Sequence, residues 1–209
     1  MEVSYVFLNI YFLFYLLIYL IVHLPFDILM ILKRGGAKYP SPPFKNLLQG
    51  ICFVIPSILF WDYITIVPLV SIFLHTDLYL LYILNFIPSI VKFIFQLIGL
   101  IIASIGLSID ALGRIGRGTY LKNPKPILST TWGHAIMRHP SYFHYITGFI
   151  SLPLITFNPI LLAFLIGIYG YVSVINTEER ALIEYFGEDY IKYMNKVGKI
   201  FPKIRKSNN

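Results

Sequence analysis

Residues 5–32 read YVFLNIYFLFYLLIYLIVHLPFDILMIL, an apolar run whose only titratable side chains besides its tyrosines are His23 and Asp27. A helix that crosses a bilayer needs about 20 predominantly apolar residues, so this run is long enough to span one. No basic segment precedes it and no small-residue cleavage site follows it. We therefore expect a retained helix and not a cleaved signal peptide.

The composition of the whole chain favours the same class. Of its 209 residues, 57% are hydrophobic and 13% are charged, whereas about a quarter of the residues are charged in a typical soluble domain. The net charge of +7 comes from basic residues that flank apolar runs, which favours a role in membrane topology over nucleic-acid binding. With Cys52 as the single cysteine, an internal disulfide and a cysteine-based metal site are excluded.

Five apolar segments predict an all-α polytopic membrane bundle with five transmembrane helices. The last two are short, and Asn158-Pro159 between them is a turn signal, so we expect a C-terminal helical hairpin. From Thr177 the pattern predicts a cytoplasmic amphipathic C-terminal helix, which Gly187 interrupts. The five predicted spans are residues 5–32, 47–74, 87–111, 141–157 and 159–175.

The basic residues orient this bundle. Sixteen of the 17 Lys and Arg residues fall in three segments that five spans place on one side of the membrane. The positive-inside rule then predicts an N-terminus outside and a cytoplasmic C-terminus. The sixteen are Lys33, Arg34, Lys38, Lys45, Arg114, Arg117, Lys122, Lys125, Arg138, Arg180, Lys192, Lys196, Lys199, Lys203, Arg205 and Lys206.

The two parts of this single predicted domain differ in character. Residues 1–110 hold the first three spans, and residues 111–209 hold most of the polar side chains. The connection over residues 112–137 is long, and loops of that length are usually functional or disordered. We therefore expect the functional part of the chain in residues 111–209, formed by the connecting loop, the hairpin and the amphipathic tail.

Arg138-His139-Pro140-Ser141-Tyr142 stands at the cytoplasmic mouth of the fourth span. Arginine binds a carboxylate through two parallel hydrogen bonds, histidine donates or accepts near neutral pH, and a helix N-terminus favours an anion. The alternative interpretation is structural: a positive-inside arginine beside an interfacial tyrosine.

Glu178-Glu179 stands at the mouth of the fifth span, and the hairpin brings it close to Arg138 and His139. Alone, an acidic pair is also typical of the solvated start of a surface helix. Together, the two mouths predict a pocket for a ligand with separated charges. S-adenosylmethionine carries a carboxylate, an ammonium, sugar hydroxyls and an apolar adenine, and so fits such a pocket.

Other ionisable residues are weaker candidates. His134, His139 and His144 recur every five residues, a spacing that does not share one helical face, so a metal site is not expected. Ionisable residues in or near spans are functional candidates by default. Asp110 is the most interesting of them because it lies at the end of the third span, next to the connection.

Residues 112–202 carry an ordered series of short motifs, each weak alone and specific as a series. They are Leu112-Gly113, Leu128, the 138–142 block, Asn158-Pro159, Glu178-Glu179, Leu182, Phe186-Gly187-Glu188, Tyr190, Tyr193 and Phe201-Pro202. This series resembles the isoprenylcysteine carboxyl methyltransferase and phospholipid methyltransferase superfamily of integral membrane methyltransferases.

The resemblance implies an enzyme that binds S-adenosyl-L-methionine on the cytoplasmic side as the methyl donor. It implies a lipophilic small molecule, a lipidated acceptor or a membrane lipid that arrives from the bilayer, with no metal and with no catalytic base assigned. Cofactor contacts are implied for Ile127, Leu128, Ser129, His134, Arg138, His139, Pro140, Ser141, Tyr142 and Glu178.

One position departs from the family pattern. Members that act on prenylated cysteine tend to carry an arginine just before the acidic pair, where this chain has Val174. Arg114, Arg117 and Arg180 are candidates to replace it. An isoprenylcysteine carboxyl group is the first acceptor expected and a phospholipid amine the second. A nicotinamide-dependent membrane reductase of the sterol type and a non-enzymatic membrane component stay open as other classes.

Overall fold

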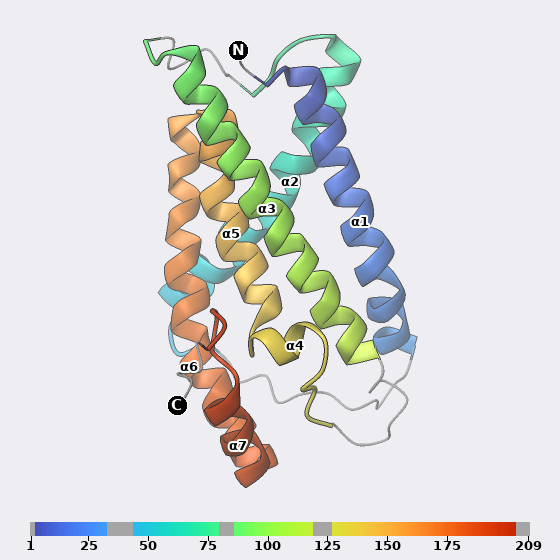
Figure 1. Ribbon diagram of the computed structural model, residues 1–209, viewed down its shortest axis with the longest axis vertical. Coiled ribbons are helices and arrows are strands. Elements are labelled where there is room, and N and C mark those ends of the chain that lie inside the picture. Colours follow the sequence, from blue (N-terminus) through green and yellow to red (C-terminus); the bar gives the residue numbers. More distant parts are fainter. Residues whose placement is uncertain (1–2, 33–43, 80–85, 119–126, 204–209) are drawn as a thin grey trace, which may run out of the picture.

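The computed structural model describes residues 3–32, 44–79, 86–118 and 127–203. These residues form seven α-helices and one 3-10 helix, which confirms the all-α prediction for this part of the chain. Figure 1 shows the long helices packed side by side, with consecutive ones running in opposite directions. In chain order they are α1 (Tyr5–Leu32), α2 (Leu47–Leu74), α3 (Ser89–Gly118), α4 (Gly133–Ile136), α5 (Pro140–Thr156), η1 (Pro159–Leu165), α6 (Ile166–Phe186) and α7 (Glu188–Lys196).

Four helical segments are long and apolar enough to cross a membrane. They are Tyr5–Pro25, Leu47–Leu74, Ser89–Arg117 and Pro159–Phe186. Apolar side chains on their outer surfaces, such as Ile10, Ile58 and Ile101, are more than half exposed. An apolar surface of this extent is unfavourable in water and favourable against lipid, as expected of an integral membrane protein.

The observed helices α1 and α2 have the predicted bounds, and the later helices differ in extent. α3 continues beyond residue 111 to Gly118, because its glycines pack against neighbouring segments and do not break it. The chain from Thr177 starts no new helix: α6 is continuous from Ile166 to Phe186. The predicted fifth span begins as the 3-10 helix η1, where Asn158 Oδ1 accepts a hydrogen bond from the Ile160 amide at 3.1 Å.

Some residues used to orient the bundle lie outside the described residues, and the prediction stands on the sequence there. These are Lys33, Arg34, Lys38, Lys122, Lys125, Arg205 and Lys206.

The main core lies between the long helices α1, α2, α3, α5 and α6, and three of its aromatic side chains lie where α2, α5 and α6 meet. Phe60, Phe149 and Tyr171 are each at most 2% exposed there, and the Phe149 and Tyr171 ring centroids are 5.9 Å apart. Leu182 and Tyr193 belong to a smaller apolar cluster that joins the end of α6 to α7. This second cluster fixes α7 against the end of α6, and α4 lies at the start of α5 (Figure 1).

Candidate functional site

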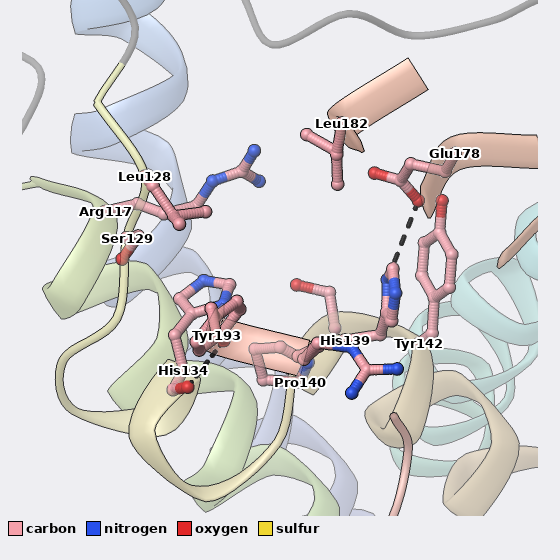
Figure 2. A pocket seen from close by; sticks show the side chains of 12 residues that line it. Arg117, Leu128, Ser129, His134, His139, Pro140, Tyr142, Glu178, Leu182 and Tyr193 are labelled. Carbon is pink, nitrogen blue, oxygen red and sulfur yellow. Dashed lines mark hydrogen bonds and ion pairs between the residues drawn. The ribbon is translucent and has the colours of Figure 1, made fainter. Parts of the chain in front are cut away.

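A pocket opens where the end of α3, the turn of α4 and the first turn of α5 face α6 and α7. About 540 Å³ of space lies inside it and in the open solvent at its mouth. Figure 2 shows the side chains that line it. They are Arg117, Leu128, Ser129, His134, Arg138, His139, Pro140, Ser141, Tyr142, Glu178, Leu182 and Tyr193.

Two glycines bring the walls of this pocket together. A Cβ atom added to Gly113 would lie 2.6 Å from Cγ of Pro140, and one added to Gly133 would lie 2.7 Å from the Ile109 carbonyl oxygen. Only glycine permits backbones to approach this closely. The close approach positions α4, and with it His134, against α3.

Arg138 joins three segments at the base of the pocket. Its Nε donates to Glu179 Oε1 at 2.7 Å, and its Nη1 donates to the carbonyl oxygens of Met194 (3.2 Å) and Val197. Both side chains of the ion pair are less than a tenth exposed. The structure thus brings the predicted basic and acidic mouths together, with Arg138 bound to protein acceptors.

The segment after α7 is attached to the same place through its backbone. The Arg138 amide donates to the Gly198 carbonyl at 2.9 Å, and the His139 amide donates to the Lys199 carbonyl at 3.1 Å. The Lys199 Nζ atom lies 3.2 Å from Glu179 Oε2. The segment after α7 therefore holds the start of α5 in place.

Glu178 is placed differently from Glu179. Its carboxylate points into the pocket (Figure 2) and lies 3.7 Å from His139 Nδ1, with 24% of the side chain exposed. His139 is 6% exposed, and its ring stacks on Tyr142 with centroids 5.3 Å apart. One wall of the pocket therefore carries a carboxylate that is open to a ligand, next to an aromatic surface.

The opposite wall carries Arg117 and His134 together with Leu128 and Ser129 (Figure 2). Burial, and then the nearby Arg117 guanidinium, lower the pKa of His134 to about 3, so its imidazole is neutral at physiological pH. Within the described residues, the buried His134 Nε2 has no hydrogen-bond partner. This nitrogen is available to a ligand.

Nine of the ten residues predicted to contact a cofactor line the pocket. Ile127 does not: its side chain is 39% exposed, because neighbouring side chains in an extended segment point to opposite sides and Leu128 faces inward. Leu182 and Tyr193, which also line the pocket, had not been assigned to it. Leu182 follows Glu178 by one helical turn, a spacing that places both on one face.

Two further observations concern metal ligands and the arginine that the resemblance leads one to expect. Among the described residues, no group of three or more His, Cys, Asp or Glu side chains is placed to hold a metal ion. Val174, where the resemblance leads one to expect an arginine, is a buried side chain of α6.

Comparison with known proteins identifies related sequences, although no protein-family model matches the chain. The chain is 36% identical over 85 residues to the protein-S-isoprenylcysteine O-methyltransferase of Saccharomyces cerevisiae. The matched residues are 40% of this chain and 36% of that protein. The chain is 31% identical over 90 residues to the methanethiol S-methyltransferase of Pseudomonas deceptionensis. The matched residues are 42% of this chain and 34% of the relative.

A third relative, methanethiol S-methyltransferase 1 of Bradyrhizobium diazoefficiens, is 34% identical over 77 residues, which are 37% of this chain and 27% of the relative. The chain thus matches about a third of the length of these curated relatives. The predicted resemblance is confirmed over that stretch: the relatives are members of the integral membrane methyltransferase family.

Proposed function

We propose that this protein is a membrane-embedded, S-adenosylmethionine-dependent methyltransferase that acts on a lipophilic acceptor. The observation that carries the proposal is the charge pattern of the pocket. Arg117 lies on one wall and Glu178 on the other (Figure 2), with Leu128 and Leu182 among the lining side chains. A cation and an anion on facing walls complement an amino-acid zwitterion, and the apolar side chains complement a base.

The lining residues fit the methyl donor group by group. The Glu178 carboxylate would accept charge-assisted hydrogen bonds from the ammonium, and the Arg117 guanidinium would bind the carboxylate. The hydroxyl groups of Ser129 and Ser141 suit the sugar. Arg138, already bonded to Glu179, would contribute a fixed positive charge at the wall.

The residues of the chain contribute position and a shielded environment for the reaction. When bound, S-adenosylmethionine supplies an electrophilic methyl group on a sulfonium. The walls would hold it in one orientation and exclude water from the reacting atoms. A carboxylate acceptor is already ionised and needs no base, whereas a thiol or amine acceptor has to lose a proton, for which we assign no residue as the base.

The acceptor is proposed to be lipophilic because it has to reach the pocket from the bilayer. The names of the relatives specify an O-methyltransferase for isoprenylcysteine and S-methyltransferases for methanethiol. Of the three arginines considered as replacements for the arginine expected at Val174, Arg117 lines the pocket. We propose an isoprenylcysteine carboxyl group first and a phospholipid amine second.

We further propose that α5 completes a fifth crossing, with the N-terminus outside and residues 111–209 forming the catalytic part at the cytoplasmic end. The 17 residues of α5 rise about 25 Å, a little less than the ~30 Å hydrocarbon core. Its partner α3 lies along it (Figure 1). Arg117, Arg138 and Lys199 then gather at one end of the bundle, as the positive-inside rule requires.

Calorimetry with S-adenosylhomocysteine, on protein purified in detergent, tests the cofactor assignment. Glu178→Gln should weaken binding about 10-fold or more, because a charge-assisted hydrogen bond contributes about 1.5–3 kcal/mol. Glu184→Gln, an exposed change on the same helix, is the matched control and should bind like the wild type. Absence of binding to the wild type overturns the proposal.

Two further measurements separate the alternatives. In thermal melts, stabilisation by NADPH without stabilisation by S-adenosylhomocysteine would favour a reductase. Transfer of a radiolabelled methyl group from S-adenosylmethionine to a membrane extract would identify the acceptor. Label in a base-labile ester is expected for a carboxyl acceptor, and label in a phospholipid fraction for an amine.

A further inference from the structure

A buried chain of three polar side chains connects the pocket to α1, which does not line it. Ser141 at the start of α5 donates a hydrogen bond to Asp110 Oδ1 of α3 at 2.6 Å. The other oxygen, Oδ2, lies 3.1 Å from Nε2 of His23 on α1. Asp110 is 1% and His23 is 2% exposed, so this chain is shielded from water while its end, Ser141, lines the pocket.

The contact of the second ring nitrogen of His23 restricts which atoms of these three side chains carry a proton. His23 Nδ1 lies 3.1 Å from the Tyr19 carbonyl oxygen, which only accepts, so Nδ1 carries a proton. Nε2 faces the Asp110 carboxyl group. Either Nε2 donates to an ionised carboxylate, or a protonated carboxyl group donates to Nε2. In both arrangements the pair shares one proton and carries no net charge.

This arrangement determines what Ser141 offers to a ligand. In both arrangements Asp110 Oδ1 is an acceptor, so the one hydroxyl proton of Ser141 points to Asp110. A hydroxyl group has one donor and two acceptor lone pairs. The Ser141 oxygen therefore presents acceptor lone pairs to the pocket, and it suits a ligand group that donates.

We propose that Asp110 is a positioning residue, which orients Ser141 to accept a hydrogen bond from a hydroxyl or ammonium group of the ligand, and that His23 holds Asp110 in place. This inference rests on the proposed function, because the ligand is the nucleoside and amino-acid portion of the methyl donor. It makes α1 a support of the pocket. A structural ion pair without this role would affect folding and leave ligand affinity unchanged.

A double-mutant cycle separates the two roles. Ser141→Ala should weaken the binding of S-adenosylhomocysteine about 10-fold, the value of one net hydrogen bond to a buried ligand group. Asp110→Ala should weaken it by a similar factor. The double variant should bind no more weakly than Ser141→Ala alone, because Asp110 acts only through Ser141.

Asp110→Asn provides the conservative variant. Its amide oxygen can accept from Ser141, and its amide nitrogen can donate to Nε2 of a neutral His23 whose Nδ1 stays bonded to Tyr19. Affinity should therefore stay within about threefold of the wild type, a difference of about 0.65 kcal/mol. A loss as large as that of Asp110→Ala would show that charge and not orientation matters, which would overturn the inference.

The matched control is another buried polar contact, between α1 and the segment after α2. Tyr79 Oη donates to Asn9 Oδ1 at 2.7 Å, and Tyr79→Phe should lower the melting temperature with unchanged affinity. If the wild type does not bind S-adenosylhomocysteine, the proposed function and this inference both fail. If the wild type binds and Ser141→Ala binds equally well, or if the cycle is additive, this inference alone fails. Ser141→Ala and Asp110→Asn decide the matter even where Asp110→Ala does not fold.

Discussion

Replacing Arg138 by alanine tests whether this side chain joins the helices at the pocket or anchors the ligand. Its guanidinium donates to Glu179 at 2.7 Å and to the carbonyl oxygens of Met194 and Val197. These acceptors belong to α6 and to the end of α7 with the residue after it. Without Arg138, the start of α5 loses these side-chain connections to α7 and the residue after it, and His139 remains as its contact with Glu179 on α6.

The expected loss of folding stability depends on the contacts that Glu179 keeps when Arg138 is removed. Removing one partner of a buried ion pair typically costs about 3–5 kcal/mol, because the other charge stays buried. Lys199 Nζ and His139 Nε2 each remain 3.2 Å from a Glu179 oxygen, so we expect the lower end, about 3 kcal/mol. For a chain of this size about 1 kcal/mol shifts the melting temperature by ~2–4 °C, so the expected decrease is about 6–12 °C.

The assay is thermal unfolding in detergent, with S-adenosylhomocysteine binding measured on the same samples. Arg138→Ala combined with Glu179→Gln should recover part of the loss, because no unpaired carboxylate is left. The exposed Arg180→Ala controls for the removal of one arginine. A melting temperature within about 2 °C of the wild type, together with lost binding, would refute the reasoning and assign Arg138 to the ligand.

Three further changes test the walls of the pocket. The pKa of His134 is about 3 in the folded chain and about 6.5 in the unfolded chain. The unfolded chain therefore takes up the proton first, and the stability of the fold decreases as the pH decreases from about 6.5 to about 3. His134→Asn should flatten that decrease in thermal melts. Gly133→Ala should lower both the melting temperature and ligand affinity, because the new methyl group would contact the Gly113 amide nitrogen; unchanged affinity would contradict this packing role. Tyr193→Phe removes the 2.6 Å hydrogen bond from the tyrosine hydroxyl to the His134 carbonyl and should cost about 1 kcal/mol, measured by denaturant unfolding.

The apolar helices were predictable because lipid imposes one strong rule on sequence, namely long apolar runs. The bounds of α1 and α2 follow from it directly. Helix ends within polar segments were less predictable. α3 continues beyond Ala111 to Gly118 because Gly113 packs closely against Pro140, a tertiary contact that overrides the low helix propensity of glycine.

The site residues were likewise predictable only in part. The nine predicted cofactor contacts that line the pocket were chosen from the resemblance, at its motifs or at positions near them. Arg117 was a candidate only as one of three arginines, since spacing cannot show which arginine faces a pocket formed by four other segments. Tyr193 reaches the pocket because the apolar cluster it forms with Leu182 docks α7 against α6, and that docking is a property of the fold.

Glu178 and Glu179 show why neighbouring residues with the same chemistry take different roles. Successive side chains on an α-helix point about 100° apart, so two adjacent carboxylates cannot face one pocket equally. Glu178 faces the pocket with 24% of its side chain exposed, whereas Glu179 turns to Arg138 and Lys199 and is 6% exposed. The buried Glu179 holds the wall together, whereas Glu178 has the 3.7 Å contact with His139 and is open to a cationic ligand group. We therefore expect Glu179 to support the fold and Glu178 to bind the ligand of the proposed function, so substitutions at the two positions should separate stability from affinity.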